Sequence, residues 1–188
     1  AHSVFANAPK GIDISELALT GVRDAYRSEN REPLSHELVR EALGIAISNP
    51  RSALLIGMSA LETGLKNYLE HLVAGSGIIL EKLPAPPVIT MLQEIIPSLH
   101  RKFGTPNDEF PLDRDRSDYL KKWVSQRNQV AHGIKADVDS ESLLVFLKFV
   151  RAILYSLDLC RGMQWAGAFA LSAKAGDGSQ SEYLQSSY

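Results

Sequence analysis

Residues 117–133 read SDYLKKWVSQRNQVAHG. Apolar side chains in this stretch return every three or four positions, which is the spacing of one face of an α-helix. Gly133 fits the left-handed position that commonly closes a helix, so we predict a helix over 117–132. Its apolar face consists of Leu120, Trp123, Val124 and Ala131, and continues to Ile134.

The same periodicity recurs along the chain and predicts an all-α protein. Helices are predicted at about 14–27, 36–48, 50–73, 88–103 and 141–171. No segment alternates with period two, so we expect no strands. Short polar connections favour antiparallel neighbours, and the strongest apolar faces belong to 50–73, 117–132 and 141–171. We therefore predict an antiparallel bundle of about five to six helices, with its core built from these three.

Local signals set several of the predicted helix ends. Ser35 is a candidate N-cap for the second helix. Asn49 followed by Pro50 is typical of an N-cap with proline at the first helical position. Pro97 lies inside the predicted helix at 88–103 and should kink or split it, because proline lacks the backbone N–H that a helix interior needs.

Length and composition indicate the kind of protein. We expect one domain over residues 1–172, with its core at 36–171, and a disordered tail rich in Ser, Gly and Gln at 173–188. The net charge of −2 and the pI of about 6.2 argue against a broadly basic nucleic-acid surface. Charged residues interrupt the apolar helix at 141–171, so we expect no membrane span. No basic segment followed by an apolar run opens the chain, so we expect a cytoplasmic protein.

Arg127 falls in the middle of the apolar face of 117–132, where a leucine would be expected. Burying an unpaired guanidinium is costly, so this arginine needs a partner. Glu62 is the best partner by position, because it lies beside the apolar face of the helix at 50–73. A Glu62–Arg127 ion pair would join two core helices. On residue chemistry alone, a structural salt bridge and a functional arginine are equally consistent with such a pair.

His132 lies about 140° around an ideal helix from Arg127, so the two do not share a face. It shares a face with Asn128, Lys121 and Ser125. Arg127 could still meet the imidazole if its side chain reached round, if the helix end opened, or if a second copy of the chain completed the site. Alternatively, His132 only caps the last carbonyl groups of the helix.

The run RNQVAHG at 127–133 resembles the Arg-(four to six residues)-His signature of the HEPN domains. The segment SALETGLK at 59–66 is similar to a second recurring part of that family, an apolar helix with an inward glutamate. The order of elements agrees over roughly residues 36–171. The resemblance implies an all-α HEPN-like bundle that forms a homodimer, with two motifs facing each other.

The resemblance also implies a metal-independent endoribonuclease, such as a toxin or a defence effector. His132 would be the proton-transfer residue, Arg127 would stabilise charge on the phosphate in the transition state, and Asn128 would orient the phosphate. Glu62 would hold Arg127. Two residues on the His132 face are expected to contact RNA: Lys121 and Ser125.

Other functions stay open at this point. Members of the same family bind a partner protein or a nucleotide without cutting RNA, and others are toxins neutralised by an antitoxin. A non-catalytic HEPN module and a purely structural helical dimerisation domain are therefore the alternatives. His36, His71 and His100 lack metal-ligand spacing and are assigned as surface or structural histidines. We expect no metal centre and no cofactor.

Overall fold

The computed structural model describes residues 32–77, 82, 87–103, 114–134 and 137–171. These residues form helices, turns and connecting segments, and no strand occurs among them. The prediction of an all-α bundle is confirmed, with five α-helices of eight residues or more in the described part of the chain. The helix predicted at 14–27 and the tail predicted at 173–188 lie outside the described residues.

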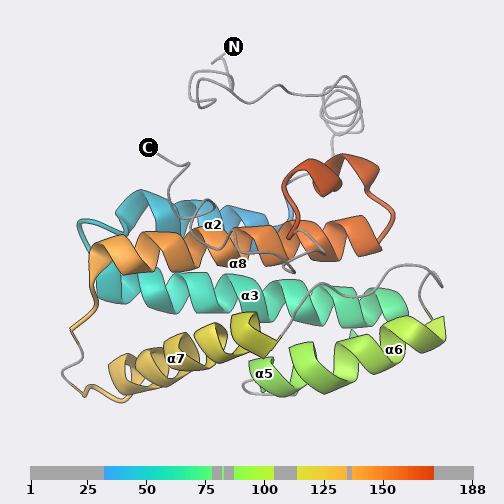
Figure 1. Cartoon of the computed structure of the whole chain (residues 1–188), viewed down its shortest axis with the longest axis horizontal. Helices are drawn as coiled ribbons and strands as arrows, with labels where there is room; N and C mark the ends of the chain where they lie inside the picture. Colours follow the sequence, from blue (N-terminus) through green and yellow to red (C-terminus); the bar gives the residue numbers. More distant parts are fainter. Residues whose placement is uncertain (1–31, 78–81, 83–86, 104–113, 135–136, 172–188) are drawn as a thin grey trace, which may run out of the picture. The chain divides into compact units, whose positions relative to one another are not determined.

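The helices follow one another in a simple order (Figure 1). They are α2 (Leu34–Ile45), α3 (Pro50–Leu72), α5 (Val88–Thr90), α6 (Ile96–Phe103), α7 (Arg114–Ala131) and α8 (Ser140–Cys160). A π-helical turn, Met91–Ile95, joins α5 to α6, and a short 3₁₀ helix, Gln164–Ala168, follows α8. None of the helices that the structure describes is long and apolar enough to span a bilayer.

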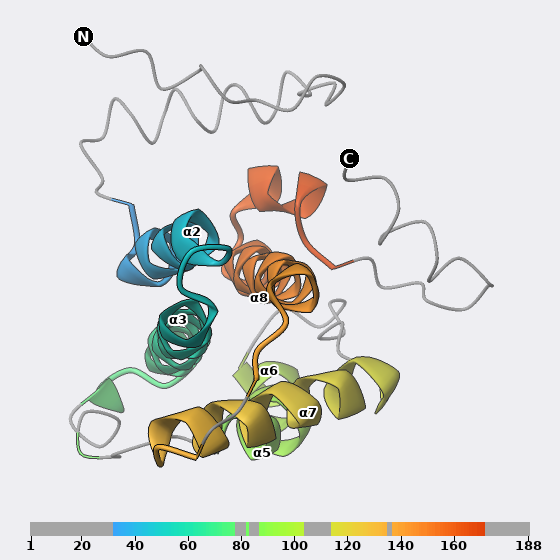
Figure 2. The same ribbon diagram turned by 90° about the vertical axis from the view of Figure 1, so that its left-hand side faces the viewer.

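Three helices, α2, α3 and α8, pack around one another, and α7 crosses below them with α5 and α6 (Figure 2). Chain neighbours such as α2 and α3 run antiparallel, as expected for short connections. The helices α3 and α8 run parallel instead: Gly57 faces Leu147, and Gly64 faces Leu154 one heptad later. Parallel packing is possible here because residues 73–139 separate the two helices in the chain.

The core lies between these helices and includes more of α2 than the sequence indicates. Both α3 and α8 bury long apolar faces, and α7 adds Leu120 and Trp123. The expected three-helix core is therefore incomplete, because α2 packs along α3 and α8 as well. Its buried apolar side chains are Val39, Ala42 and the adjoining Ala46.

Two predicted helix ends are wrong. Helix α2 begins at Leu34, so Ser35 does not cap it but lies buried in the first turn. The backbone oxygen of Pro33 accepts from the N–H groups of His36 and Glu37. Helix α8 ends at Cys160 and not near 171. Gly162 has a φ of 92° and its N–H donates to Leu159 O at 2.9 Å, which is the geometry that terminates a helix.

Two other predicted signals are confirmed. Asn49 caps α3, because its Oδ1 accepts from the N–H of Ser52 at 3.3 Å, and Pro50 is the first helical residue. The helix predicted at 88–103 is interrupted by the π turn Met91–Ile95, which ends two residues before Pro97. Widening the helix at this turn is a means of accommodating a proline that cannot donate a backbone hydrogen bond.

Candidate functional site

The motif lies at the C-terminal end of α7. This helix ends at Ala131, and Gly133 follows with a φ of 70°. The N–H of Gly133 donates to Val130 O at 3.1 Å, and the N–H of Ile134 donates to Gln129 O at 2.9 Å. These two bonds define a glycine-terminated helix end. The predicted role of Gly133 is therefore confirmed, and His132 stands at the boundary of the helix.

Arg127 is paired with Glu62, as predicted. Its Nη2 donates to Glu62 Oε1 at 3.0 Å, and the side chains are 24% and 17% exposed, respectively. The pair links α7 to α3. It explains how an arginine can occupy an otherwise apolar helix face, since its charge is offset by a carboxylate of similar burial.

Asn128 holds the other side of the same guanidinium. Its Oδ1 accepts from Arg127 Nη1 at 3.1 Å, while its backbone oxygen accepts from the N–H of His132 at 3.0 Å. The carboxamide NH₂ group of an asparagine remains a donor when its oxygen is occupied. Two acceptors therefore hold the planar guanidinium of Arg127, one from α3 and one from its own helix.

His132 is not joined to this group. His132 is exposed, and among the described residues no hydrogen bond connects its ring to Arg127 or to the Asn128 side chain. The structure thus brings together Glu62, Arg127 and Asn128, and leaves the imidazole beside them at the helix end. This agrees with the angular separation expected on an ideal helix.

The two residues predicted as RNA contacts lie on the solvent side of α7. Lys121 Nζ is 2.7 Å from Asp118 Oδ1, and the two side chains are 50% and 56% exposed. Ser125 is exposed as well. The charge of Lys121 is partly offset by its neighbour, so this face of α7 is only weakly basic.

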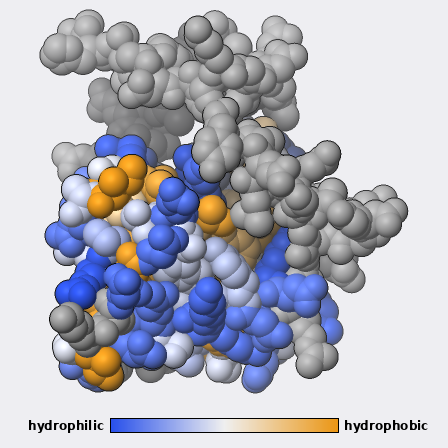
Figure 3. Space-filling model, turned by 60° about the vertical axis from the view of Figure 1, so that its left-hand side comes forward, coloured by the Kyte–Doolittle hydropathy of each residue, from blue (hydrophilic) through white to orange (hydrophobic). Residues whose placement is uncertain are grey.

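The apolar face predicted for α7 does not extend to its end. Ala131 is exposed, and Ile134 is 58% exposed. Gly133 takes the chain off the helical path, so Ile134 does not continue the buried face. On the side of the molecule drawn in Figure 3, apolar atoms form small separate spots in a mainly hydrophilic surface. The exposed Ala131 and Ile134, which flank His132 in the chain, form an apolar edge at this end of α7.

Aromatic residues near the motif belong to the core. Trp123 is 2% exposed and stacks on Phe146, with ring centroids 4.7 Å apart. Tyr119 packs edge-on against Phe149 at 5.6 Å, and burial raises the pKa of its hydroxyl above the ordinary value. The ring of Trp123 is not available for stacking on a base without rearrangement of the core, which agrees with the structural role expected for this residue, and Tyr119 is partly buried against the core.

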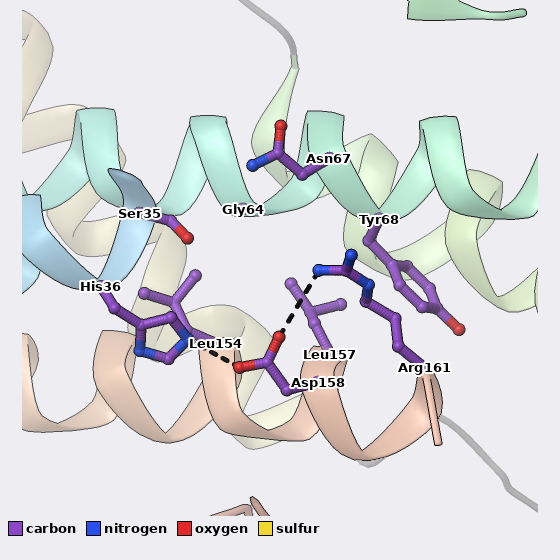
Figure 4. A pocket seen from close by; sticks show the side chains of 9 residues that line it. All are labelled: Ser35, His36, Gly64, Asn67, Tyr68, Leu154, Leu157, Asp158 and Arg161. Carbon is purple, nitrogen blue, oxygen red and sulfur yellow. Dashed lines mark hydrogen bonds and ion pairs between the residues drawn. The ribbon is translucent and has the colours of Figure 1, made fainter. Parts of the chain in front are cut away.

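A second polar cluster, which the sequence did not indicate, lies where α2, α3 and the end of α8 meet (Figure 4). His36 Nε2 and Asp158 Oδ2 are 2.7 Å apart and buried, and Arg161 Nη1 lies 3.7 Å from Asp158 Oδ1. The pair ties the start of α2 to the end of α8. The sequence contains a signal for this cluster, because Asp158 is a charged residue on the apolar face of α8. The same kind of conflict between residue type and position singled out Arg127.

The hollow beside this cluster is too small for a substrate. Its free volume of about 10 Å³ is close to that of a single water position. Tyr68 forms one wall, and its hydroxyl is 2.6 Å from Nδ1 of the buried His100. His36 and His100 are therefore structural histidines, as expected, whereas His71 is exposed. Among the residues that the structure describes, no three His, Cys, Asp or Glu side chains are grouped as metal ligands.

Comparisons of the chain with protein-family models, with curated proteins and with solved structures find no match. A function for the chain therefore rests on the arrangement of its side chains and on the resemblance of residues 127–133 to the HEPN signature.

Proposed function

We propose that the chain is a HEPN-like, metal-independent endoribonuclease that works as a homodimer. The observation that supports this most directly is the arrangement around Arg127. Its guanidinium is held half-buried between Glu62 and Asn128, next to an exposed histidine at a helix end. A planar cation fixed in this way suits the oxygens of a phosphodiester.

The reaction needs two proton transfers. A base takes the proton of a ribose 2′-hydroxyl, the 2′-oxygen forms a bond to phosphorus, and the bond from phosphorus to the 5′-oxygen breaks as an acid protonates that oxygen. The products are a 2′,3′-cyclic phosphate and a 5′-hydroxyl. Histidine is suited to both transfers near neutral pH. In the proposed dimer, His132 and His132 of the partner subunit supply them.

Two features of the protomer support a site that is completed by a second copy. His132 is separated from Arg127 within one chain, so a protomer alone presents the cation and the imidazole apart. Ile134 and Ala131 are exposed directly beside His132, which provides apolar area for contact with a second chain. Facing motifs would place the imidazole of one protomer near the guanidinium of the other.

One observation favours the alternative of a non-catalytic HEPN module. Such a module would bind a nucleotide or a partner protein such as an antitoxin. Both cations of the candidate site have acidic neighbours, Glu62 for Arg127 and Asp118 for Lys121. This reduces the positive potential that would attract a long RNA strand. A purely structural dimerisation domain, by contrast, leaves the exposed His132 without a role.

The test compares wild type, His132→Ala and His71→Ala on labelled single-stranded RNA and tRNA in the presence of EDTA. His71 is a matched control, because it is an exposed histidine at the end of α3 and outside the motif. We expect cleavage with cyclic phosphate ends by wild type and His71→Ala, and none by His132→Ala. Absence of cleavage by wild type on both RNAs would favour the binding module.

A further inference from the structure

The last turns of α7 are tied to two different neighbours by consecutive side chains. Arg127 reaches α3 through Glu62. Gln126 reaches the segment that leads into α8, because its Nε2 donates to the backbone oxygen of Asp137 at 2.8 Å. Consecutive helical residues point about 100° apart, so two such contacts hold the helix from different sides. Gln126 is half-buried, unlike the exposed Gln129 one turn later.

The segment that Gln126 holds is also anchored further on. Val138 is 6% exposed, and Asp139 caps α8 by accepting from the N–H of Ser142 at 2.8 Å. His132 therefore lies between two fixed points of the backbone. On one side its N–H is bound to Asn128 O, and on the other Gln126 fixes the position of Asp137.

We propose that Gln126 is a positioning residue that sets the place of His132 through the backbone. The ring of His132 is exposed and has no described hydrogen-bond partner in the protomer, so its position depends on the backbone that carries it. A group that transfers protons must be held within about 0.5 Å of its productive position. The helix-end hydrogen bonds of residues 132–134 hold the backbone from the α7 side, and the amide of Gln126 adds a second restraint by bonding the chain five residues beyond the imidazole. Its catalytic consequence rests on the proposed ribonuclease function, whereas the restraint itself does not.

Gln126→Glu is the most direct test, because it keeps the size of the side chain and replaces the donor with a carboxylate oxygen that Asp137 O repels. Gln129→Glu is the matched control, with the same change in charge on the same helix and no donor lost to Asp137. Gln126→Ala is the second variant, in case the added charge prevents folding. Gln126→Lys restores a donor to the position and serves as the rescue.

Backbone ¹⁵N relaxation of the full chain is the first readout. In wild type and Gln129→Glu we expect order parameters near 0.85 at His132, Gly133 and Ile134, and in Gln126→Glu and Gln126→Ala values below about 0.6. Gln126→Lys should return them toward wild type. Unchanged order parameters in both Gln126→Glu and Gln126→Ala would overturn the inference.

Cleavage kinetics separate the two proposals. If wild type cleaves RNA, Gln126→Glu should lower kcat by about tenfold to a hundredfold, with KM changed less than about twofold, because a displaced group slows chemistry more than binding. An unchanged kcat would refute the catalytic role of Gln126. If wild type does not cleave RNA but the relaxation data change as expected, the proposed function fails and the positioning of His132 by Gln126 stands.

Discussion

Glu62 Oε1 and Arg127 Nη2 are 3.0 Å apart, although 65 positions separate the two residues in the chain. Arg127 lies in a mostly apolar face of α7, Glu62 lies beside the apolar face of α3, and each side chain is less than one-quarter exposed. The pair therefore has two structural consequences. It allows α7 to pack on α3, and it presents a guanidinium in a fixed plane next to the end of the motif helix.

Removing either member of this pair should destabilise the fold. We expect Glu62→Gln and Arg127→Met each to lower the free energy of unfolding by about 1–3 kcal/mol, because each leaves a partly buried charge or polar group without its partner. The double variant should lose less than the sum, with a coupling energy of about 1–2 kcal/mol by urea denaturation. The exposed pair Lys121–Asp118 is the control, with an expected coupling below about 0.5 kcal/mol. Equal couplings for the two pairs would contradict the structural role given to Glu62.

The apolar edge beside His132 should carry the proposed dimer contact. Ile134→Glu is expected to shift the chain from dimer to monomer in sedimentation velocity, because it places a charge in the contact, and to abolish RNA cleavage with it. Ile47→Glu is the control, since Ile47 is even more exposed, at 76%, but lies in the connection between α2 and α3. A wild-type chain that sediments as a monomer, or an Ile134→Glu variant that remains a dimer, would argue against this contact.

The close approach of α3 and α8 depends on glycine. A Cβ at Gly64 would overlap Cδ2 of the buried Leu154, so Gly64→Val should destabilise the protein by about 1–3 kcal/mol through overpacking. Gly44 in α2 has no atom near its would-be Cβ, so Gly44→Ala should stabilise by up to about 1 kcal/mol through its higher helix propensity. Thermal unfolding of the two variants tests this difference in sign, and a stabilised Gly64→Val protein would show that the two helices are not packed in this way.

The cap of α8 should make stability depend on acid pH. Hydrogen bonds from the side chain and the backbone N–H of Ser142 hold the pKa of Asp139 below its ordinary value. Because the folded pKa is lower than the unfolded one, the carboxylate stabilises the fold above about pH 4, and this contribution is lost as the pH falls further.

We therefore expect Asp139→Ala to lower the Tm by a few degrees at pH 7, roughly the effect of losing one N-cap, and by less at pH 3. Asp139→Asn keeps a neutral cap, so the Tm of this variant should change less between pH 7 and pH 3 than the Tm of wild type. A difference between wild type and Asp139→Ala that grows toward pH 3 would show that the carboxylate does not stabilise the helix.

The helices and the Glu62–Arg127 pair could be predicted because their signals are local. A charged residue in an apolar helix face requires a partner, and few acids lie on inward faces, so the position of Arg127 is enough to single out Glu62. The cap at Asn49 and the turn at Gly133 are likewise properties of a few adjacent residues. Their physical chemistry does not depend on which helices meet.

The missed features depend on long-range packing. The apolar periodicity continues beyond Gly162 and hides the end of α8, since a pattern of side chains does not report the φ of one glycine. The His36–Asp158 pair joins residues 122 positions apart. It exists only because α2 packs on α8. The strongest apolar faces in the sequence predicted a core of α3, α7 and α8, without α2.

The parallel packing of α3 and α8 has a consequence for synthesis on the ribosome. The glycine positions of α3 fit leucines that are translated about 90 residues later, as in Gly64 and Leu154. Until that helix emerges, the nascent chain has made α2, α3 and the motif helix without the surface that covers them. Long-range contacts of this kind form late and slowly. A nascent chain of the proposed nuclease would thus carry its complete Arg-His motif before it could fold, and would gain a working site only after α8 had been made.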